Sequence, residues 1–251
     1  MKLFFSVIIP SLNEEQHLPL LLKSLYQQIE KDFEVIIVDG KSVDKTIKIA
    51  NEWKMKFTKH NVGLKTIAAS KKNVAYQRNI GAELSRGEYL VFFDADIVIP
   101  KNFLKLIKKT ILKTKKQFVG TLTKPETDIW QDRAITSLIN LVIEIGNDIG
   151  KPLLPGYDII MKKKLFNHLG RFREDITIGE DQELTERAYT HGYAPHIIKY
   201  PTITHSSRRY RKEGYTSALY KYLLATLHVL FKGPITENII NYPMGGHVHK
   251  Q

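Results

Sequence analysis

The chain has 251 residues, of which 43% are hydrophobic and 25% are charged, so it is long enough for one large α/β domain or two small ones. It contains no cysteine, which excludes disulfides and thiolate metal sites, and no apolar run reaches the roughly 20 residues of a membrane-spanning helix. The formal net charge of +12 favours an anionic partner such as a nucleoside diphosphate, a nucleic acid or an anionic lipid.

The first half of the sequence alternates between short apolar runs and helical patterns. The apolar runs have the length of buried parallel strands and cover Leu3–Ile9, Phe33–Asp39 and Tyr89–Asp94. The helical patterns lie between them, over Leu18–Ile29, from Asp44 to about Trp53, and over Asn73–Ser85. This alternation predicts an α/β fold with a doubly wound, mostly parallel sheet.

The pattern becomes less regular after Asp96. Further helices are predicted over Phe103–Ile111, Ile135–Ile145 and Gln182–His191, and strands over Phe118–Leu122, Leu154–Met161 and Tyr200–His205. From Ser206 onward the composition shifts, because a basic cluster, Arg208–Lys212, precedes an apolar segment, Ala218–Phe231. We therefore expect a main domain over residues 1–205 and a basic, amphipathic C-terminal extension over residues 206–251.

Polar side chains follow each of the first-half strands. In a doubly wound sheet, ligands bind beyond the carboxyl ends of the strands, so Pro10–Asn13, Asp39 and the Asp94-Ala95-Asp96 triplet should face one crevice. Two carboxylates one residue apart suit a divalent cation that shares its oxygen ligands with substrate phosphates. This spacing arises often by chance, and its weight comes from the apolar strand before it and from the acidic pair Glu180-Asp181 further on.

Five ordered motifs resemble the family-two glycosyltransferases. They are Ser6–Glu15, Ile36–Thr46, Arg78–Gly81, Asp94–Asp96 and Gly179–Asp181, and the resemblance covers roughly residues 3 to 205. It implies the GT-A fold, a nucleotide-sugar donor and Mg²⁺ or Mn²⁺ as cofactor. It also implies that residues 1–96 form a nucleotide-binding half and residues 97–205 an acceptor half.

The resemblance places the nucleoside on the first two loops. Pro10, Asn13 and Glu14 should lie beside the base and ribose, and Asp39 should accept a hydrogen bond from the edge of the base. Each position also has a structural interpretation: a strand end with a helix cap for the first three, and the opening of the Asp39-Gly40 turn for the aspartate.

The same resemblance assigns the diphosphate and the metal ion. Arg78 should lie beside the donor diphosphate, where a guanidinium suits phosphate oxygens; the alternative is a solvated arginine on a helix. Asp96 should ligate the metal, with Asp94 nearer the ribose or a metal-bound water and Ala95 between them in the nucleotide-sugar site. Such an ion would make the diphosphate a better leaving group.

The acidic pair Glu180-Asp181 is the expected catalytic centre. The resemblance makes Asp181 the general base that takes the proton of the acceptor hydroxyl, in a single displacement that inverts the anomeric carbon. Acids in a first helical turn also complement the helix dipole, which is the structural alternative. A late histidine, His205, is a candidate additional metal ligand, because imidazole suits Mn²⁺; a strand-end histidine is also commonly structural.

The acceptor side and the extension are less specified. Gly156 and Tyr157 resemble an acceptor segment in which the glycine admits the sugar and the aromatic ring stacks on it. Arg208 and Arg209 could contact phosphate or an anionic membrane, or form a solvated basic patch. The segment Ala218–Phe231 could lie in a membrane interface beside a lipid-linked acceptor, or pack on the domain or on a second subunit.

The predicted activity is therefore that of a metal-dependent, inverting glycosyltransferase. It would move a sugar from a UDP- or GDP-sugar to a hydroxyl of a glycan or a lipid-linked acceptor. A cytoplasmic location, with peripheral contact to the inner face of an anionic membrane, is consistent with this activity, and a homodimer remains open. Nucleic acid is not an expected partner.

Three rival interpretations are less well supported. A nucleotidyltransferase would normally carry a glycine-rich, basic loop after the first strand, whereas Pro10–Glu15 is acidic and lacks glycine. A nucleic-acid-binding protein is suggested by charge alone, without the aromatic and basic patterns of common RNA-binding modules. A scaffold that has kept the fold and lost activity is disfavoured by the intact carboxylates.

Overall fold

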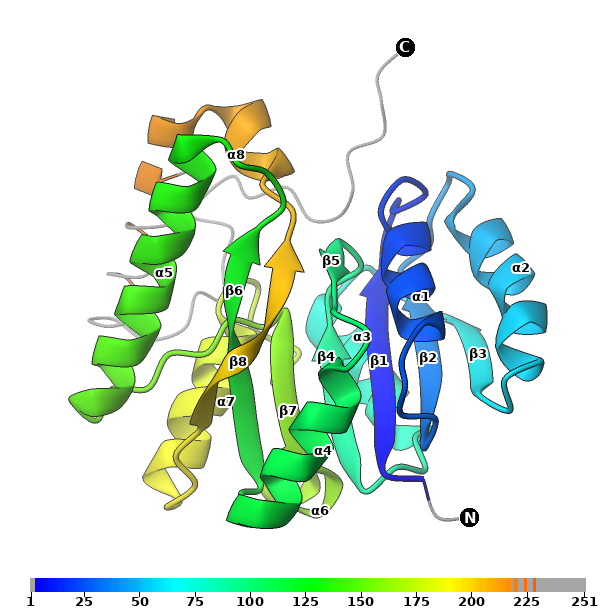
Figure 1. The fold of residues 1–251 in the computed structure, drawn as a ribbon, viewed down its shortest axis with the longest axis horizontal. Coiled ribbons are helices and arrows are strands. Elements are labelled where there is room, and N and C mark those ends of the chain that lie inside the picture. The colour runs from blue at the N-terminus through cyan, green and yellow to red at the C-terminus, as the bar shows by residue number, and fades with distance from the viewer. Residues whose placement is uncertain (1–2, 218, 221–223, 225–227, 229–251) are drawn as a thin grey trace.

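One mixed sheet organises the chain (Figure 1). The computed structural model describes residues 3–217, 219, 220, 224 and 228, with residues 209 and 213 described by their backbone alone. Within this part the sheet has eight strands in the order β3-β2-β1-β4-β7-β6-β8-β5. The strands are β1 (Phe5–Ser11), β2 (Phe33–Asp39), β3 (Gly63–Ala68), β4 (Tyr89–Phe93), β5 (Ile97–Val98), β6 (Phe118–Pro125), β7 (Asp158–Lys162) and β8 (His196–His205).

The strand directions divide the sheet. Strands β3, β2, β1 and β4 are all parallel, as the alternation of the first half predicts. Strand β7 is antiparallel to both β4 and β6, β8 is parallel to β6, and β5 is antiparallel to β8. The sheet is therefore mostly parallel, with its antiparallel pairs in the second half.

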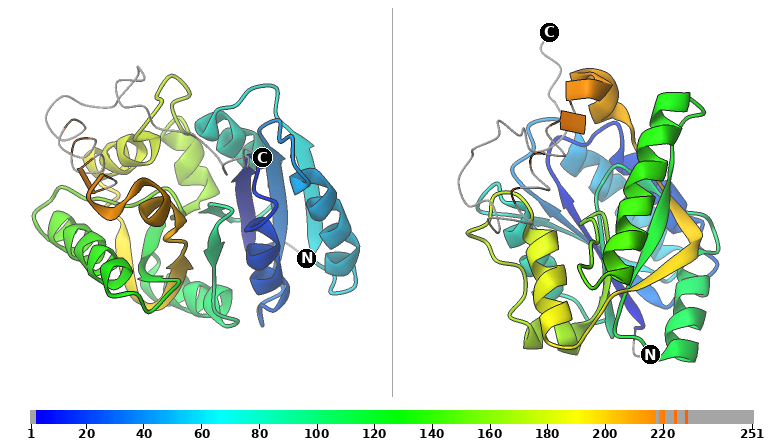
Figure 2. Two further views of the ribbon diagram at one scale, coloured as in Figure 1. Left: turned by 90° about the horizontal axis from the view of Figure 1, so that it is seen from above. Right: turned by 90° about the vertical axis from the view of Figure 1, so that its left-hand side faces the viewer.

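Helices cover both faces of the sheet (Figure 2). They are α1 (Leu18–Tyr26), α2 (Thr46–Thr58), α3 (Val74–Glu83), α4 (Phe103–Thr114), α5 (Trp130–Asp148), α6 (Lys163–His168), α7 (Glu180–Thr190) and α8 (Arg208–Glu213). The side chains of β1 alternate between two apolar clusters: Val7 and Ile9 pack with Leu21 and Leu25 of α1, whereas Ile8 packs with Ala75 of α3. Burial on both faces explains why the run is continuously apolar.

Several element boundaries differ from the predicted ones. Strand β3 is not predicted, because this edge strand alternates between exposed and buried residues and carries Lys65 at its centre. Helix α2 continues to Thr58, beyond Trp53, and α5 begins at Trp130 rather than Ile135. Helix α3 agrees closely with the prediction, and the Asn73 side chain caps it by accepting a hydrogen bond from a backbone N–H.

The C-terminal extension is described only in part. Helix α8 lies near the first turn of α5 (Figure 1), and the Tyr215 hydroxyl donates to Asp132 of α5 at 2.9 Å. The predicted apolar segment Ala218–Phe231 lies outside the described residues except for four positions, and so does the Arg209 side chain. Among the helices that the structure describes, none combines the length and apolarity that crossing a bilayer requires.

Candidate active site

The predicted strand-end residues meet at one edge of the sheet. Because β2, β1 and β4 are neighbours and parallel, their carboxyl ends lie together at the upper edge of the sheet in Figure 1. Asp39 ends β2, Asn13 follows β1 closely, and Asp94 directly follows β4. The convergence inferred from the sequence is therefore present in the fold.

The first two loops are tied to each other by the residues predicted to hold the nucleoside. Asn13 adopts a left-handed backbone conformation with φ of 56°, which asparagine tolerates better than most residues. Its backbone N–H donates to the Ser42 hydroxyl at 2.8 Å, and its side-chain oxygen accepts from the backbone N–H of Val43 at 2.9 Å. The buried Asp39 carboxylate accepts from the Ser42 hydroxyl at 2.5 Å and from its N–H at 2.9 Å. These bonds fix both loops in place.

An arginine of the extension reaches the acidic end of the crevice. The Arg208 guanidinium donates to Glu14 at 2.6 Å and lies 3.4 Å from Asp96. Burial raises the pKa of Glu14 to about 7, against the opposing effect of Arg208. The second Glu14 oxygen is buried and has no hydrogen-bond partner among the described residues. Asp96 also lines a small cavity together with His17 and Glu126.

Arg78 lies buried within the site. It is 2% exposed, so it is not the solvated arginine that its position on a helix also allowed. One guanidinium nitrogen donates to Glu180 at 2.7 Å, and another donates to Asp94 at 2.9 Å and to the backbone carbonyl of Gly156 at 3.0 Å. A single buried cation thus joins the end of β4, the start of α7 and the loop before β7.

The acidic pair at the start of α7 lies beside this arginine. Asp181 accepts hydrogen bonds from the backbone N–H groups of Gly156 at 2.6 Å and Gln182 at 2.8 Å. Burial raises the pKa of Asp181, although Arg78 and these hydrogen bonds oppose the rise. Burial, together with the neighbouring Asp181 charge, raises the pKa of Glu180 to about 7. A carboxylate whose pKa is raised by burial is a stronger base, which suits it to general-base work.

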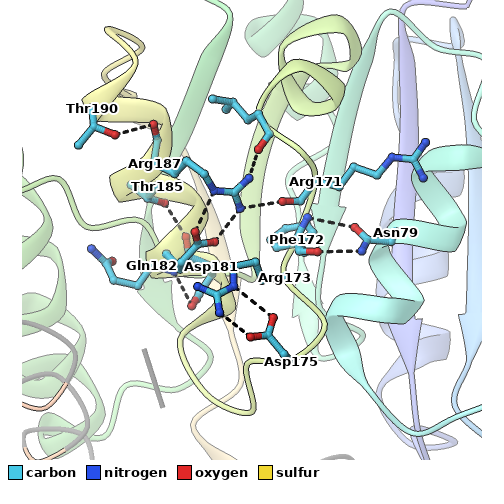
Figure 3. A network of polar contacts seen from close by, with 12 residues as sticks. Asn79, Arg171, Phe172, Arg173, Asp175, Asp181, Gln182, Thr185, Arg187 and Thr190 are labelled. Carbon is cyan, nitrogen blue, oxygen red and sulfur yellow. Dashed lines mark hydrogen bonds and ion pairs between the residues drawn. The ribbon is translucent and has the colours of Figure 1, made fainter. Parts of the chain in front are cut away.

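A polar network holds α7 in position (Figure 3). Arg187 donates to Glu183 of the same helix at 2.6 and 2.8 Å and to the backbone carbonyl of Arg171 at 2.8 Å. On the other side of the same segment, the Asn79 side chain donates to the Phe172 carbonyl at 2.9 Å and accepts from its N–H at 3.1 Å. Residues 171–172 therefore connect α7 to α3, the two helices that carry the acidic pair and Arg78.

The two aromatic candidates lie together. The rings of Tyr157 and His205 have centroids 4.8 Å apart, at an interplanar angle of 35°. His205 pairs through its backbone with Ile97, the residue that follows Asp96. No group of three histidine and acidic side chains in the described part of the chain is already arranged to hold a metal ion. The roles of Tyr157 and His205 remain predictions.

Comparison with known proteins identifies the family. The model of Glycosyl transferase family 2 matches residues 6–170, which is more than half of the chain. The chain belongs to this family. The chain is 31% identical over 116 residues to a dolichyl N-acetyl-alpha-D-glucosaminyl phosphate 3-beta-D-2,3-diacetamido-2,3-dideoxy-beta-D-glucuronosyltransferase of Methanococcus voltae. The match covers 45% of this chain and 36% of that relative, so the chain spans about a third of its length.

Two solved structures of glycosyltransferases have the same fold. S. aureus TarS 1-349 in complex with UDP-GlcNAc superimposes with a TM-score of 0.66 at 22% identity, covering 82% of this chain and 59% of that chain. The mannosyltransferase PcManGT from Pyrobaculum calidifontis, in complex with GDP-Man and Mn²⁺, gives a TM-score of 0.67 at 21% identity, covering 89% and 65%. The predicted GT-A fold is confirmed, and so is the predicted membership of Glycosyl transferase family 2. Neither the nucleotidyltransferase nor the nucleic-acid-binding alternative is favoured.

Proposed function

We propose that the chain is a metal-dependent, inverting glycosyltransferase that moves a sugar from a UDP- or GDP-sugar to a hydroxyl of a glycan or a lipid-linked acceptor. One observation carries the proposal: Arg78 joins Asp94, on the donor side, to the acidic pair at the start of α7. The binding residues and the candidate base therefore belong to one cluster. The two structural neighbours are in complex with UDP-GlcNAc and GDP-Man, and the Methanococcus relative is named for a dolichyl-linked phosphate; both support the proposed substrate classes.

The carboxylates at the crevice fit a divalent ion. Asp94 is partly exposed, Asp96 offers hard oxygen ligands, and the Asp96 carboxylate already lies beside a cation, the Arg208 guanidinium. Mg²⁺ commonly binds one or two carboxylates and completes its shell with substrate phosphates, so a complete set of protein ligands is not required. Asp96 would hold Mg²⁺ or Mn²⁺, together with Asp94 and His205, which lie nearby in the fold. The bound ion would act as a Lewis acid that assists departure of the diphosphate.

The chain's own residues then orient the donor. The loop with Pro10, Asn13 and Glu14 and the carboxylate of Asp39 would surround the nucleoside, on loops that are already fixed by the Ser42 hydrogen bonds. Arg208 is well placed to contact the diphosphate, because its guanidinium lies beside Asp96 and forms bidentate bonds with phosphate oxygens readily.

Asp181 would accept the proton of the acceptor hydroxyl. The acceptor oxygen attacks the anomeric carbon as the diphosphate leaves from the opposite side, so one displacement inverts the centre. A Cβ at Gly156 would lie 3.0 Å from the Asp181 carboxylate and 2.9 Å from the Arg78 guanidinium, so the glycine leaves this space free. The neighbouring Tyr157 ring supplies a face on which an acceptor sugar could stack.

Replacing Asp181 by asparagine tests the proposal. General-base catalysis typically accelerates a reaction 10²–10⁴-fold, so Asp181→Asn should lower the rate of sugar transfer at least about 100-fold. The rate is measured as nucleoside diphosphate formed in the presence of a mixed pool of glycan and lipid-linked acceptors. Its affinity for UDP or GDP with Mn²⁺ should stay unchanged in calorimetry. Asp175→Asn, at an exposed carboxylate, is the matched control and should keep full activity. Wild-type turnover of Asp181→Asn would reject the assignment.

A further inference from the structure

Helix α5 carries an exposed apolar stripe along its whole length. Trp130 is 72% exposed, Leu138 45%, Leu141 51%, Ile145 48% and Ile149, which follows the last turn, 67%; Ala134 is also exposed. These residues are spaced by three or four positions and therefore share one helical face. The opposite face carries the buried Ile143, and α5 packs against β6, while the helix itself lies at the outer edge of the molecule (Figures 1 and 2). Contiguous exposed apolar surface of this kind marks an interaction site.

The stripe is symmetric about its midpoint between residues 139 and 140. Reversing the direction of the helix brings Trp130 to the level of Ile149 and Ala134 to that of Ile145, and likewise pairs Leu138 with Leu141. Each large side chain at one end thus meets an apolar residue, and the small Ala134 meets the branched Ile145. A surface that matches itself after reversal is what a two-fold, isologous contact requires. We propose that the occupant of the stripe is the α5 helix of a second copy of this chain, packed antiparallel.

The charges of α5 support the same arrangement. By helical spacing, Arg133, Glu144 and Asp148 lie on one flank of the stripe, and in an antiparallel pair equal flanks face each other. The register that pairs the stripe places Arg133 between Glu144 and Asp148 of the second copy, about 3 Å along the axis from each at 1.5 Å per residue. Although Glu144 also pairs with Lys199 of its own chain at 2.5 Å, both acids oppose a basic residue in this arrangement.

An anionic membrane is a poorer occupant. The flank of the stripe carries Arg133, Glu144 and Asp148, and Glu144 pairs with Lys199, so this surface has no net positive charge to attract anionic lipid head groups. One helix face is small relative to the roughly 800 Å² per partner of stable complexes. We therefore expect a reversible dimer with a dissociation constant in the micromolar range, separate from the catalytic crevice.

The absence of cysteine permits a direct test of the register. Mixing equal amounts of Leu138→Cys and Leu141→Cys protein under mild oxidation should give the disulfide-linked heterodimer at well above the roughly twofold excess over either homodimer that random pairing produces. Leu112→Cys, at a 61% exposed leucine of α4, is the matched control and should crosslink only weakly. A heterodimer at only about twice the amount of either homodimer, or crosslinking of Leu112→Cys to the same extent, would overturn the proposed contact.

Equilibrium sedimentation tests the affinity and the charges. Leu141→Glu should raise the dimer dissociation constant at least tenfold. At protein concentrations below the wild-type dissociation constant it should not lower the melting temperature, because the side chain is exposed in the monomer. Arg133→Glu should weaken the dimer, and the double variant Arg133→Glu/Asp148→Arg should restore it. A wild-type protein that stays monomeric at 100 μM would overturn the proposal. So would loss of phosphatidylglycerol vesicle binding, rather than of self-association, in Leu141→Glu. The catalytic rate of Leu141→Glu is measured as well, because a variant with an unchanged rate would show that the proposed function does not depend on the dimer.

Discussion

Replacing Arg78 by methionine should destabilise the protein in a strongly pH-dependent way. Methionine keeps the unbranched aliphatic stem and removes the charge, so Glu180 loses its 2.7 Å cationic partner inside the fold. The Gly156 carbonyl loses its hydrogen bond as well, while the partly exposed Asp94 can regain water. The perturbation therefore acts mainly on the buried acidic pair of α7.

The expected magnitude follows from the protonation of Glu180. With Arg78 in place the pKa of Glu180 is about 7, against an ordinary value of 4.5, because burial outweighs the attraction of the arginine. Without that attraction the pKa rises further. An acid whose pKa is higher in the folded state gives stability that is present below its unfolded pKa and lost as the pH rises through its folded pKa. Each pH unit over which Glu180 is ionised only in the wild-type protein adds about 1.4 kcal/mol to the loss in the variant.

Urea denaturation at pH 5 and pH 8 measures this difference. At pH 5 Glu180 is protonated in both proteins, so the variant should lose only about 1 kcal/mol, the value of a lost hydrogen bond. At pH 8 the loss should reach roughly 2–2.5 kcal/mol, because wild-type Glu180 is ionised over about one pH unit in which the variant carboxyl stays protonated. Arg173→Met, which breaks the exposed pair with Asp175, should change the stability little at either pH. An equal loss for Arg78→Met at both pH values would refute the reasoning.

Two further substitutions test the packing beneath the site. The buried Asp158 carboxyl accepts a hydrogen bond from the Thr121 hydroxyl at 2.5 Å, and burial raises the pKa of Asp158 to about 7. The free energy of unfolding of the wild-type protein should therefore fall as the pH rises from about 4 to 7, by up to about 1.4 kcal/mol per pH unit. Asp158→Asn should make this fall shallower in urea titrations. An unchanged slope would show that the carboxyl does not titrate there. A Cβ at Gly81 would lie 2.4 Å from an Ile8 methyl group, so Gly81→Ala should cost about 1–3 kcal/mol of stability and lower the melting temperature. Gly63→Ala is the control, because a Cβ there would have its nearest neighbour at 3.7 Å, and it should leave the melting temperature unchanged. Equal melting temperatures for the two variants would contradict this prediction.

The sequence predicts those parts of the fold that local pattern determines. The continuous apolar runs of β1, β2 and β4 mark strands buried on both faces, and the strand ends therefore identify the crevice and its carboxylates. The edge strand β3 lacks this pattern, since only one of its six residues is fully buried, and a segment of this kind resembles a loop in sequence. A strand can therefore be predicted from this sequence when both of its faces are buried, whatever the strand propensity of its residues.

Local sequence patterns do not predict contacts between residues that are distant in the chain. Arg78 and Glu180 are separated by 102 positions, and Arg208 and Glu14 by 194, so nothing local distinguishes these arginines from solvated ones. The Arg78 motif indicates a functional residue, but its burial depends on the packing of α3 against the loop before β7. For Arg208, the basic cluster is the only signal in the sequence, and it does not specify Glu14 as partner.

Nucleoside diphosphate binding by Asp96 tests the central claim most directly. UDP and GDP are titrated calorimetrically into wild-type protein and into Asp96→Asn, each with and without Mn²⁺, with the exposed Asp128→Asn as matched control. The account predicts that wild type and the control bind one of the two nucleotides in a Mn²⁺-dependent manner, and that Asp96→Asn binds it at least tenfold more weakly. Equal, metal-independent affinity in all three proteins would contradict the account.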